Sequence, residues 1–332
     1  MNKGSRQGRV MPENLLSIDG LKTYFRTDGE PIRAVDGVSL ALARGEVFGL
    51  VGESGSGKTM TALSIMRLIP VPGRIVEGSI TFEGRDLAGL TSDEMQKVRG
   101  NRIGMIFQEP LTSLNPVLRI GDQLSEGLIV HKGLSNQEAK GVAVELLGKV
   151  GFDQPENRYL QYPHQLSGGQ RQRVLIAIAI ACNPSLIIAD EPTTALDVTI
   201  EAQILKLLEA LIADRSMSML FITHNLHLIR RIADRVGIMY AGRMVEEAPV
   251  ADFLTHPQHP YSQGLLDSLP EFAVGVKRLK AIPGSVPRLS EMPEGCPFHP
   301  RCVHAMDRCR AEAPGPTITG ENRCVRCFLY ET

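Results

Sequence analysis

The sequence predicts an α/β protein whose parallel sheet is covered by helices and followed by a small cysteine-rich extension. Apolar runs of strand length alternate with segments of helical spacing, an order typical of a parallel sheet with helices on both faces. A glycine-rich loop, Gly52 to Thr59, lies between one such strand and one such helix. Near the other end, five cysteines lie within the last thirty-seven residues: Cys296, Cys302, Cys309, Cys324 and Cys327.

The elements can be placed in order along the chain. The predicted strands are short, mostly apolar runs bounded by turn residues: 15–18, 34–42, 46–51, 80–82, 103–107, 186–189 and 219–223. Four predicted helices share the helical spacing of apolar side chains: 60–69, 121–151 with a break at 133–135, 169–182 and 200–214. A further, polar helix is predicted around Asp93, Glu94 and Lys97. Ser135 followed by Glu138 fits a capping box, which predicts a helix start at that break.

The length of 332 residues exceeds the size at which one core usually keeps growing, so one large domain with a smaller appendage is expected. The alternating pattern decays into proline-rich chain after Glu247, which indicates a boundary nearby. We predict a flexible opening at 1–14, a main domain at 15–255 with a helical lobe at about 110–180, and an extension at 256–332.

Composition and charge narrow the classes of function. Thirty-six basic and thirty-seven acidic residues leave a net charge of −1, which gives no sequence-wide electrostatic reason to expect nucleic acid or an anionic membrane as partner. The longest apolar run, Val174 to Cys182, is about half of what a bilayer span requires, and Cys182 within it is expected to be a core residue. The first twelve residues lack the apolar stretch of a secretory signal, so we expect a cytosolic protein with reduced thiols.

The glycine-rich loop matches the P-loop spacing. Its glycines let successive backbone amides turn toward a polyphosphate, Lys58 can reach the β and γ oxygens, and the Thr59 hydroxyl can bind magnesium. A flexible glycine turn is the alternative, which the position between a strand and a helix makes the weaker one. The predicted ATP contacts in this run are Gly52, Ser54, Gly55, Ser56, Gly57, Lys58, Thr59 and Met60.

Two carboxylates, Asp190 and Glu191, end a predicted apolar strand at the sheet edge where ligands of open α/β folds bind. Asp190 can hold hydrated magnesium, and Glu191 can orient or deprotonate an attacking water. An acidic pair is also an ordinary helix-start signal, but its combination with a P-loop favours the catalytic interpretation.

The run Leu166-Ser167-Gly168-Gly169-Gln170 resembles the signature of the ATP-binding cassette (ABC) family, and it lies between the two nucleotide motifs as that family requires. The resemblance implies a RecA-like parallel core, an N-terminal antiparallel β subdomain and a helical subdomain. It also implies that two subunits pack head to tail, so that one chain's signature contacts the nucleotide held by the other's P-loop. The implied contacts to the partner's ATP are Ser167, Gly168, Gly169, Gln170 and Asp197.

Other positions match the same family. Gln108, after a strand ending in Phe107, resembles the glutamine that contacts magnesium and the attacking water, and His224 resembles the histidine that contacts the γ-phosphate. Ala195-Leu196-Asp197 resembles the loop that crosses the dimer seam. Tyr24 lies where the family places an aromatic ring on adenine; Phe25 is the competing residue, and core packing is an alternative for both.

Several runs resemble the dipeptide/oligopeptide permease subfamily, including the stretch from Phe107 to Pro116 and the tail from Gly295 to Cys302. The resemblance implies an ATPase subunit of a bacterial peptide importer, lying peripherally on the cytoplasmic face of the plasma membrane. It implies as partners a second cassette, two transmembrane permease subunits and, indirectly, an extracytoplasmic peptide-binding protein, without nucleic acid. Nickel or glutathione uptake remains open, and a non-transport cassette ATPase or an exporter half is a weaker alternative.

Thiols grouped in a reduced segment with little core are typical of a structural metal site. The subfamily resemblance implies a four-iron, four-sulfide cluster held by Cys296, Cys302, Cys309 and Cys327, with Cys324 as an extra thiol or alternative ligand. Zinc, unliganded thiols and disulfides remain alternatives.

Overall fold

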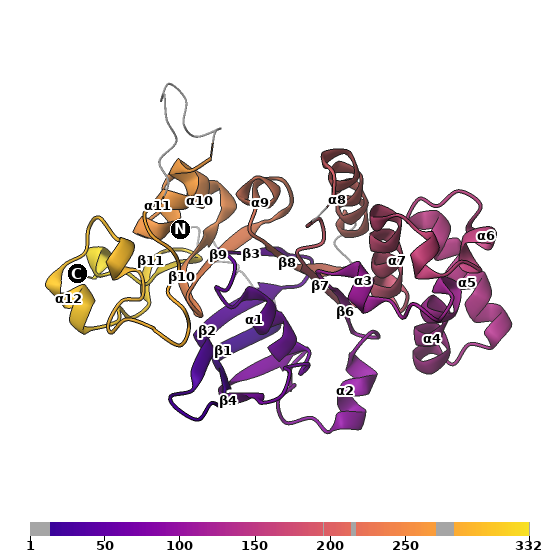
Figure 1. The fold of residues 1–332 in the computed structure, drawn as a ribbon, viewed down its shortest axis with the longest axis horizontal. Coiled ribbons are helices and arrows are strands. Elements are labelled where there is room, and N and C mark those ends of the chain that lie inside the picture. The colour runs from indigo at the N-terminus through magenta and orange to yellow at the C-terminus, as the bar shows by residue number, and fades with distance from the viewer. Residues whose placement is uncertain (1–13, 195, 214–216, 270–281, 332) are drawn as a thin grey trace, which may run out of the picture.

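The computed structural model describes residues 14–194, 196–213, 217–269 and 282–331, in which two β-sheets and their helices form the elongated body in Figure 1. The larger sheet has the strand order β11-β12-β10-β9-β3-β8-β7-β6. Its strands are β3 (Val47–Val51), β6 (Ile103–Ile106), β7 (Leu186–Asp190), β8 (Ser218–Thr223), β9 (Arg235–Tyr240), β10 (Arg243–Pro249), β11 (Thr317–Gly320) and β12 (Arg323–Val325).

The central strands confirm the predicted parallel sheet. Strand β3 pairs in parallel with β8 and β9, and β7 pairs in parallel with β6 and β8. Every residue of β3, β7 and β8 is buried, which explains why these strands are continuous apolar runs without alternation. Strands β9 and β10 were not among the predicted elements, because charged side chains and Gly237 interrupt their apolar pattern.

The smaller sheet is antiparallel, with the order β2-β1-β4-β5, as the family resemblance implies. Its buried side chains join Phe48, Leu50 and Ile188 of the parallel sheet in one apolar cluster, so the two sheets share a core. The strands are β1 (Asn14–Phe25), β2 (Ile32–Ala43), β4 (Gly73–Phe82) and β5 (Arg85–Asp86).

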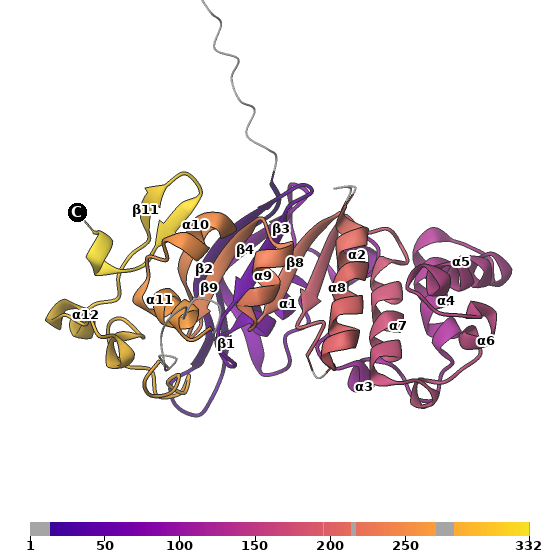
Figure 2. The same ribbon diagram turned by 90° about the horizontal axis from the view of Figure 1, so that it is seen from above.

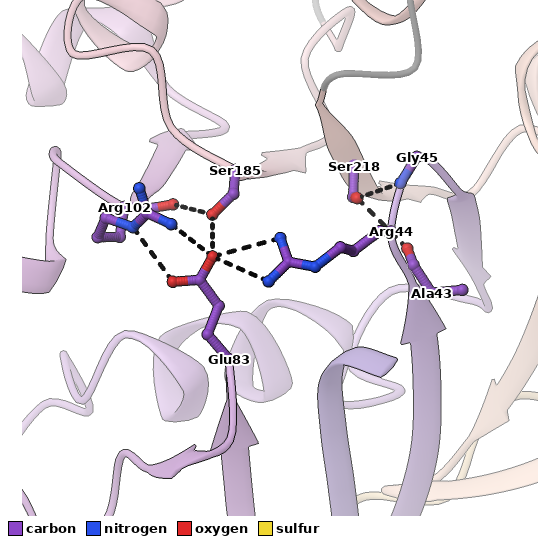
Figure 3. Close-up of polar contacts among 7 residues, drawn as sticks. All are labelled: Ala43, Arg44, Gly45, Glu83, Arg102, Ser185 and Ser218. Atoms are coloured by element: carbon purple, nitrogen blue, oxygen red, sulfur yellow. Dashed lines mark hydrogen bonds and ion pairs between the residues drawn. The ribbon is translucent and has the colours of Figure 1, made fainter. Parts of the chain in front are cut away.

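Glu83, just after β4, joins the antiparallel sheet to the residues that directly precede strands β6 and β7 of the parallel one, Arg102 and Ser185 (Figure 3). Its carboxylate accepts hydrogen bonds from both Arg102 Nη2 at 2.5 Å and Arg102 Nε at 3.2 Å. Ser185 Oγ donates to it at 3.0 Å, and Arg44 lies 3.5 Å away. Burial alone raises the pKa of Glu83, but the bonds from Arg102 and Ser185 and the charges of Arg102 and Arg44 outweigh it and hold the pKa below its usual value.

The helices divide between the sheet faces and a separate lobe. Helices α7 and α8 lie side by side on the sheet, and the lobe lies beyond them, at the opposite end from the C-terminal extension (Figures 1 and 2). The predicted capping box is confirmed: Ser135 Oγ accepts from the amide of Glu138, and the Glu138 carboxylate accepts from the amide of Ser135. The lobe contains α4 (Ile120–Lys132), α5 (Asn136–Lys149) and α6 (Pro155–Tyr159), whereas α3 (Pro110–Ser113) lies on the sheet side of α7 and contacts it.

The remaining helices begin close to the predicted positions where a prediction was made. They are α1 (Lys58–Ile65), α2 (Ser92–Val98), α7 (Gly168–Ile180), α8 (Val198–Ile212), α9 (Leu226–Ile232), α10 (Val250–Thr255), α11 (Pro260–Asp267) and α12 (Asp307–Ala311). Within the described ranges, none of them combines the length and apolarity needed to cross a bilayer.

The C-terminal extension pairs with the main sheet. In β12, Val325 and Cys324 pair antiparallel with Glu246 and Glu247 of β10. Phe298 packs its ring against those of Tyr240 and Tyr261, with centroids 5.2 and 5.4 Å away. These contacts join residues on both sides of position 255, where we predicted the main domain to end, and that boundary stays a prediction. Of the predicted flexible opening at 1–14, only Asn14 lies within the described residues.

Candidate functional site

The loop between β3 and α1 has a backbone that only glycine fits at several positions. A Cβ on Gly52 would lie 2.2 Å from the carbonyl oxygen of Met239. Gly55 and Gly57 have φ angles of +78° and +101°, in the left-handed region that favours glycine. The chain therefore turns tightly around Ser56, which is buried, and enters α1 at Lys58.

Lys58 is buried at the mouth of this loop. Its ammonium donates to the carbonyl oxygens of Gly52 at 2.8 Å and Glu53 at 3.1 Å, and lies 3.9 Å from Glu191 Oε1. Burial lowers the pKa of Lys58, while the charges of Glu191, Asp190 and Glu53 act in the opposite direction. The loop thus presents a fixed cation beside two carboxylates.

Thr59 and Asp190 form the oxygen pair expected of a magnesium site. Thr59 Oγ1 donates to Asp190 Oδ1 at 3.2 Å. Burial, together with the neighbouring charge of Glu191, raises the pKa of Asp190 to about 6, against the hydrogen bond from Thr59 and the charge of Lys58. A hydroxyl and a carboxylate beside a phosphate cradle fit Mg²⁺, which prefers oxygen ligands and shares them with substrate phosphates.

Glu191 lies at the centre of the candidate catalytic group. Gln108 Nε2 donates to Glu191 Oε2 at 3.3 Å, and His224 Nδ1 lies 3.1 Å from the same oxygen. Thr194 Oγ1 also donates to it, at 2.8 Å. Glu191 has a φ of +46°, a conformation that costs energy in a residue other than glycine and recurs at functional sites.

Thr194 is a residue that the sequence analysis missed. Its only signal is a hydroxyl three residues after Glu191, in a stretch that the predicted motifs did not include. The three side chains that converge on Glu191 come from different segments, Gln108 after β6, Thr194 after β7 and His224 after β8.

The signature run caps a helix. Ser167 Oγ accepts from the Gln170 amide at 3.3 Å, and the Gln170 side chain accepts from the Ser167 amide at 3.0 Å, a reciprocal cap for α7. Ser167 and Gly168 are exposed. Gly169 instead packs so closely against α8 that a Cβ added to it would lie 2.5 Å from the side chain of Ile200.

Asp197 caps α8, accepting from the Ile200 amide at 3.0 Å, and it too is exposed. Ala195 lies outside the described residues. Helices α7 and α8 lie toward the lobe, whereas α1 lies nearer the antiparallel sheet (Figures 1 and 2).

The aromatic candidates lie at the end of β1. Tyr24 Oη donates to Asp36 Oδ1 at 2.6 Å; burial, this bond and the charge of Asp36 raise the pKa of Tyr24 to about 12. Its ring is only partly buried. Phe25 packs so closely over Gly73 that a Cβ there would lie 2.7 Å from the ring. An adenine contact remains a prediction for Tyr24.

Comparison with known proteins identifies the family. The family model "ABC transporter" matches residues 35–194, and "Oligopeptide/dipeptide transporter, C-terminal region" matches 245–309. The oligopeptide transport ATP-binding protein AppD of Bacillus subtilis is 53% identical over 318 residues, covering 96% of this chain and 97% of AppD. The chain belongs to the ATP-binding proteins of ABC transporters, in the oligopeptide/dipeptide group.

A further relative and a solved structure support the assignment of the chain to the ABC family. The dipeptide transport ATP-binding protein DppD of Escherichia coli is 46% identical over 313 residues, covering 94% of this chain and 96% of DppD. Among solved structures, the cassette resembles the dimeric, post-hydrolysis ATP-binding cassette MJ0796 bound to ADP and phosphate. That match has a TM-score of 0.64 and 30% identity, and covers 71% of this chain and 98% of the other.

The tail of the cassette holds a second group of side chains. Cys296, Cys302, Cys309 and Cys327 line one small cavity of about 20 Å³. Burial, together with the charges of the other three thiols, raises the pKa of Cys296 to about 11, against a hydrogen bond from the backbone of Phe298. Across the described ranges, however, no three His, Cys, Asp or Glu side chains are arranged so that they could hold a metal ion. The predicted iron–sulfur or zinc site therefore stays a prediction.

Cys324 does not share this cavity. It lines a different one, beside Arg326 and Glu247. Cys182 is buried in the core at the end of α7, as expected, and its thiol donates to the carbonyl of Gly127 at 3.4 Å.

Proposed function

We propose that this cassette hydrolyses ATP as the energy-coupling subunit of an importer for dipeptides or oligopeptides. The observation that carries the proposal is the convergence of Gln108, Thr194 and His224 on the Glu191 carboxylate, beside the P-loop lysine. Relatives named for oligopeptide and dipeptide transport, similar over nearly the whole chain, support the substrate class. The close resemblance of nickel and glutathione importers keeps those solutes as alternatives.

The proposed chemistry assigns a role to each of these side chains. The amides of the glycine loop and Lys58 bind the triphosphate, and Glu191 accepts a proton from the attacking water, which Gln108 and His224 orient. Thr59 and Asp190, with Gln108, would hold Mg²⁺, which would supply positive charge to the phosphates. Tyr24 stacks on the adenine, and Ser54, Ser56 and Met60 complete the loop contacts.

The site needs a second cassette, identical or paralogous. Ser167, Gly168, Gly169, Gln170 and Asp197 of one chain contact the ATP on the partner's P-loop. Two features support this. Ser167 and Gly168 are exposed at the start of a capped helix, where amides and the helix dipole favour an anion. The MJ0796 cassette, 30% identical, is described as dimeric.

The membrane subunits contact the region after Gln108. Three large apolar side chains there are exposed to water: Leu111 at 68%, Val117 at 76% and Leu118 at 43%. An exposed apolar patch beside a catalytic loop favours a partner surface. In this arrangement the cassette lies peripherally on the cytoplasmic face of the plasma membrane, bound to two permease subunits. An extracytoplasmic peptide-binding protein delivers the peptide to those subunits.

The thiol cavity is a candidate for a sulfur-ligated metal, with a four-iron cluster preferred over zinc. The support is the chemistry of the donors and not their present arrangement: four thiols line one cavity in a tail with little apolar core of its own. Bound there, the metal would supply cross-linking that stabilises the tail. Cys324, which lines a different cavity, is not among the proposed ligands.

Replacing Glu191 with Gln tests the ATPase proposal. The change keeps the shape of the side chain but removes the base, so ATP binding should persist, turnover should fall by about a hundredfold or more, and ATP should trap a closed dimer. Glu209→Gln, at an exposed carboxylate paired with Arg231, is the matched control and should turn over normally. Near-normal hydrolysis by Glu191→Gln would refute the base assignment.

A further inference from the structure

An arginine from the C-terminal extension reaches into the glycine loop. Arg301 Nη1 lies 3.1 Å and 3.4 Å from the two carboxylate oxygens of Glu53, although the two residues are 248 positions apart. Arg301 is only 8% exposed, so its charge is largely withdrawn from water and paired with this carboxylate.

Several contacts fix the guanidinium in place. Its Nε donates to the Pro283 carbonyl at 2.8 Å, and Nη1 donates to the hydroxyl of Tyr240 at 3.4 Å. The guanidinium carbon also lies 5.7 Å from the centroid of the Tyr240 ring and 6.0 Å from that of Phe298. An arginine held on this many sides is pre-organised, because little side-chain entropy is left to lose when it pairs.

The extension also forms a hydrogen bond with the backbone of Glu53. The Glu53 amide donates to the hydroxyl of Tyr261, in α11, at 3.1 Å. The carbonyl of the same residue accepts from the ammonium of Lys58. Glu53 is thus held by the tail on one side and by the phosphate-binding lysine on the other.

The charge of Glu53 is a liability in this position. The loop binds a polyanion, and a carboxylate within it opposes that binding unless a cation offsets it. The side chain of Glu53 is 31% exposed, and its charge acts on Lys58. Arg301 is the cation that the structure pairs with it, and the tail holds that arginine through the Pro283 carbonyl.

We propose that Arg301 is a positioning residue of the ATP site, which offsets the charge of Glu53 and holds its side chain so that the loop accepts the triphosphate. The inference deepens the proposed ATPase function and rests on it. Arg301 lies between two of the cavity thiols, in the turn from Cys296 to Cys302. Backbone bonds from His299 to Cys296 and from Cys302 to His299 order that turn. The turn that carries two of the cavity thiols therefore also holds the arginine that pairs with the nucleotide loop.

A double-mutant cycle of charge-neutralising substitutions in the full chain tests the proposal. Arg301→Gln leaves the Glu53 carboxylate unpaired, so the KM for ATP should rise by about fivefold or more while kcat changes less. Adding Glu53→Gln in the same chain removes the unpaired charge and should return the KM to within about twofold of wild type. The matched control is Arg308→Gln, which removes another paired arginine of the tail, with Glu312 and Glu331 as partners, and should leave the KM unchanged.

The outcomes separate three cases. Wild-type protein that neither binds nor hydrolyses ATP refutes the proposed function itself. With ATPase activity present, a double variant as impaired as Arg301→Gln overturns the inference, because a purely structural arginine would not be rescued by changing Glu53. If Arg301→Gln does not fold, Glu53→Gln alone decides: a KM equal to or below wild type supports the inference, and a higher KM overturns it.

Discussion

Thr59 and Asp190, 131 residues apart, are joined by a hydrogen bond of 3.2 Å from the threonine hydroxyl to the carboxylate. The contact brings the first turn of α1 against the end of β7. Asp190 is only 2% exposed, and burial raises its pKa, so the protein maintains a carboxylate where the charged form is disfavoured. The fold accepts this cost at the position where magnesium is proposed to bind.

Asp190→Asn should therefore separate stability from activity. Without nucleotide or metal, the variant should unfold at the same or a higher temperature, gaining up to about 2 kcal/mol because the buried charge is removed. Hydrolysis of ATP with magnesium should fall by about a hundredfold or more. Thermal unfolding and steady-state turnover measure the two effects, and a destabilised variant with normal turnover would contradict both.

Ser167→Asp should preserve the cap of α7 but place a negative charge where the partner's γ-phosphate is proposed to bind. Asp caps helices about as well as Ser, so thermal stability without ATP should stay near wild type. ATP-dependent dimerisation, measured by size-exclusion chromatography in the Glu191→Gln background, should be lost.

Thr91→Asp is the matched control, since Thr91 forms the same reciprocal cap with Glu94 at the start of α2. That variant should dimerise normally. A Ser167→Asp protein that dimerises as well as its parent would remove Ser167 from the proposed interface.

Glu83→Gln should lower stability in a pH-dependent way. The pKa of Glu83 is depressed below its ordinary value of 4.5, so its contribution is fully present above that pH and is lost as the pH falls through the lower folded value. At pH 7 the variant should lose on the order of 1 kcal/mol, because Glu83 is partly exposed and solvent screens its pairs. Urea unfolding should show the difference shrinking below pH 4.5; Glu77→Gln, at the exposed pair with Lys22, should change stability less.

Cys309→Ser and Cys324→Ser should differ in metal content. Cys309 lines the shared thiol cavity and Cys324 does not, so only the first change should remove bound iron, sulfide and visible absorbance from anaerobically purified protein. Zinc without colour, lost in the same variant, would favour the zinc alternative. Metal loss in the Cys324 variant alone would contradict the proposed ligand set.

Local patterns were enough to predict the centre of the fold. The capping box of Ser135 and Glu138 lies at the start of a helix, as predicted, and it can be recognised in the sequence because both residues lie within one turn. Strand β7 ends at Asp190, one residue past its predicted apolar run. Helix α8 begins at Val198, two residues before the prediction, because Asp197 caps it.

Long-range contacts were not predictable in the same way. Glu246 is a charged residue that is 1% exposed, and its partners are the amides of Gln258 and His259 and the side chain of Arg323. No local sequence pattern predicts that a glutamate in a strand is buried. Strand β10 was therefore not predicted. The pairing of Arg301 with Glu53 likewise joins segments whose proximity depends on the whole sheet.

The pairing of β12 with β10 has a consequence for synthesis of the protein. Strand β10 cannot acquire this neighbour until residues 323–325, which follow it only after a long intervening stretch of chain, have left the ribosome. Until then, β10 presents unpaired backbone groups along one edge, the feature that makes nascent sheets prone to association with other chains. Emergence of β12, rather than emergence of the nucleotide motifs, therefore closes this side of the molecule.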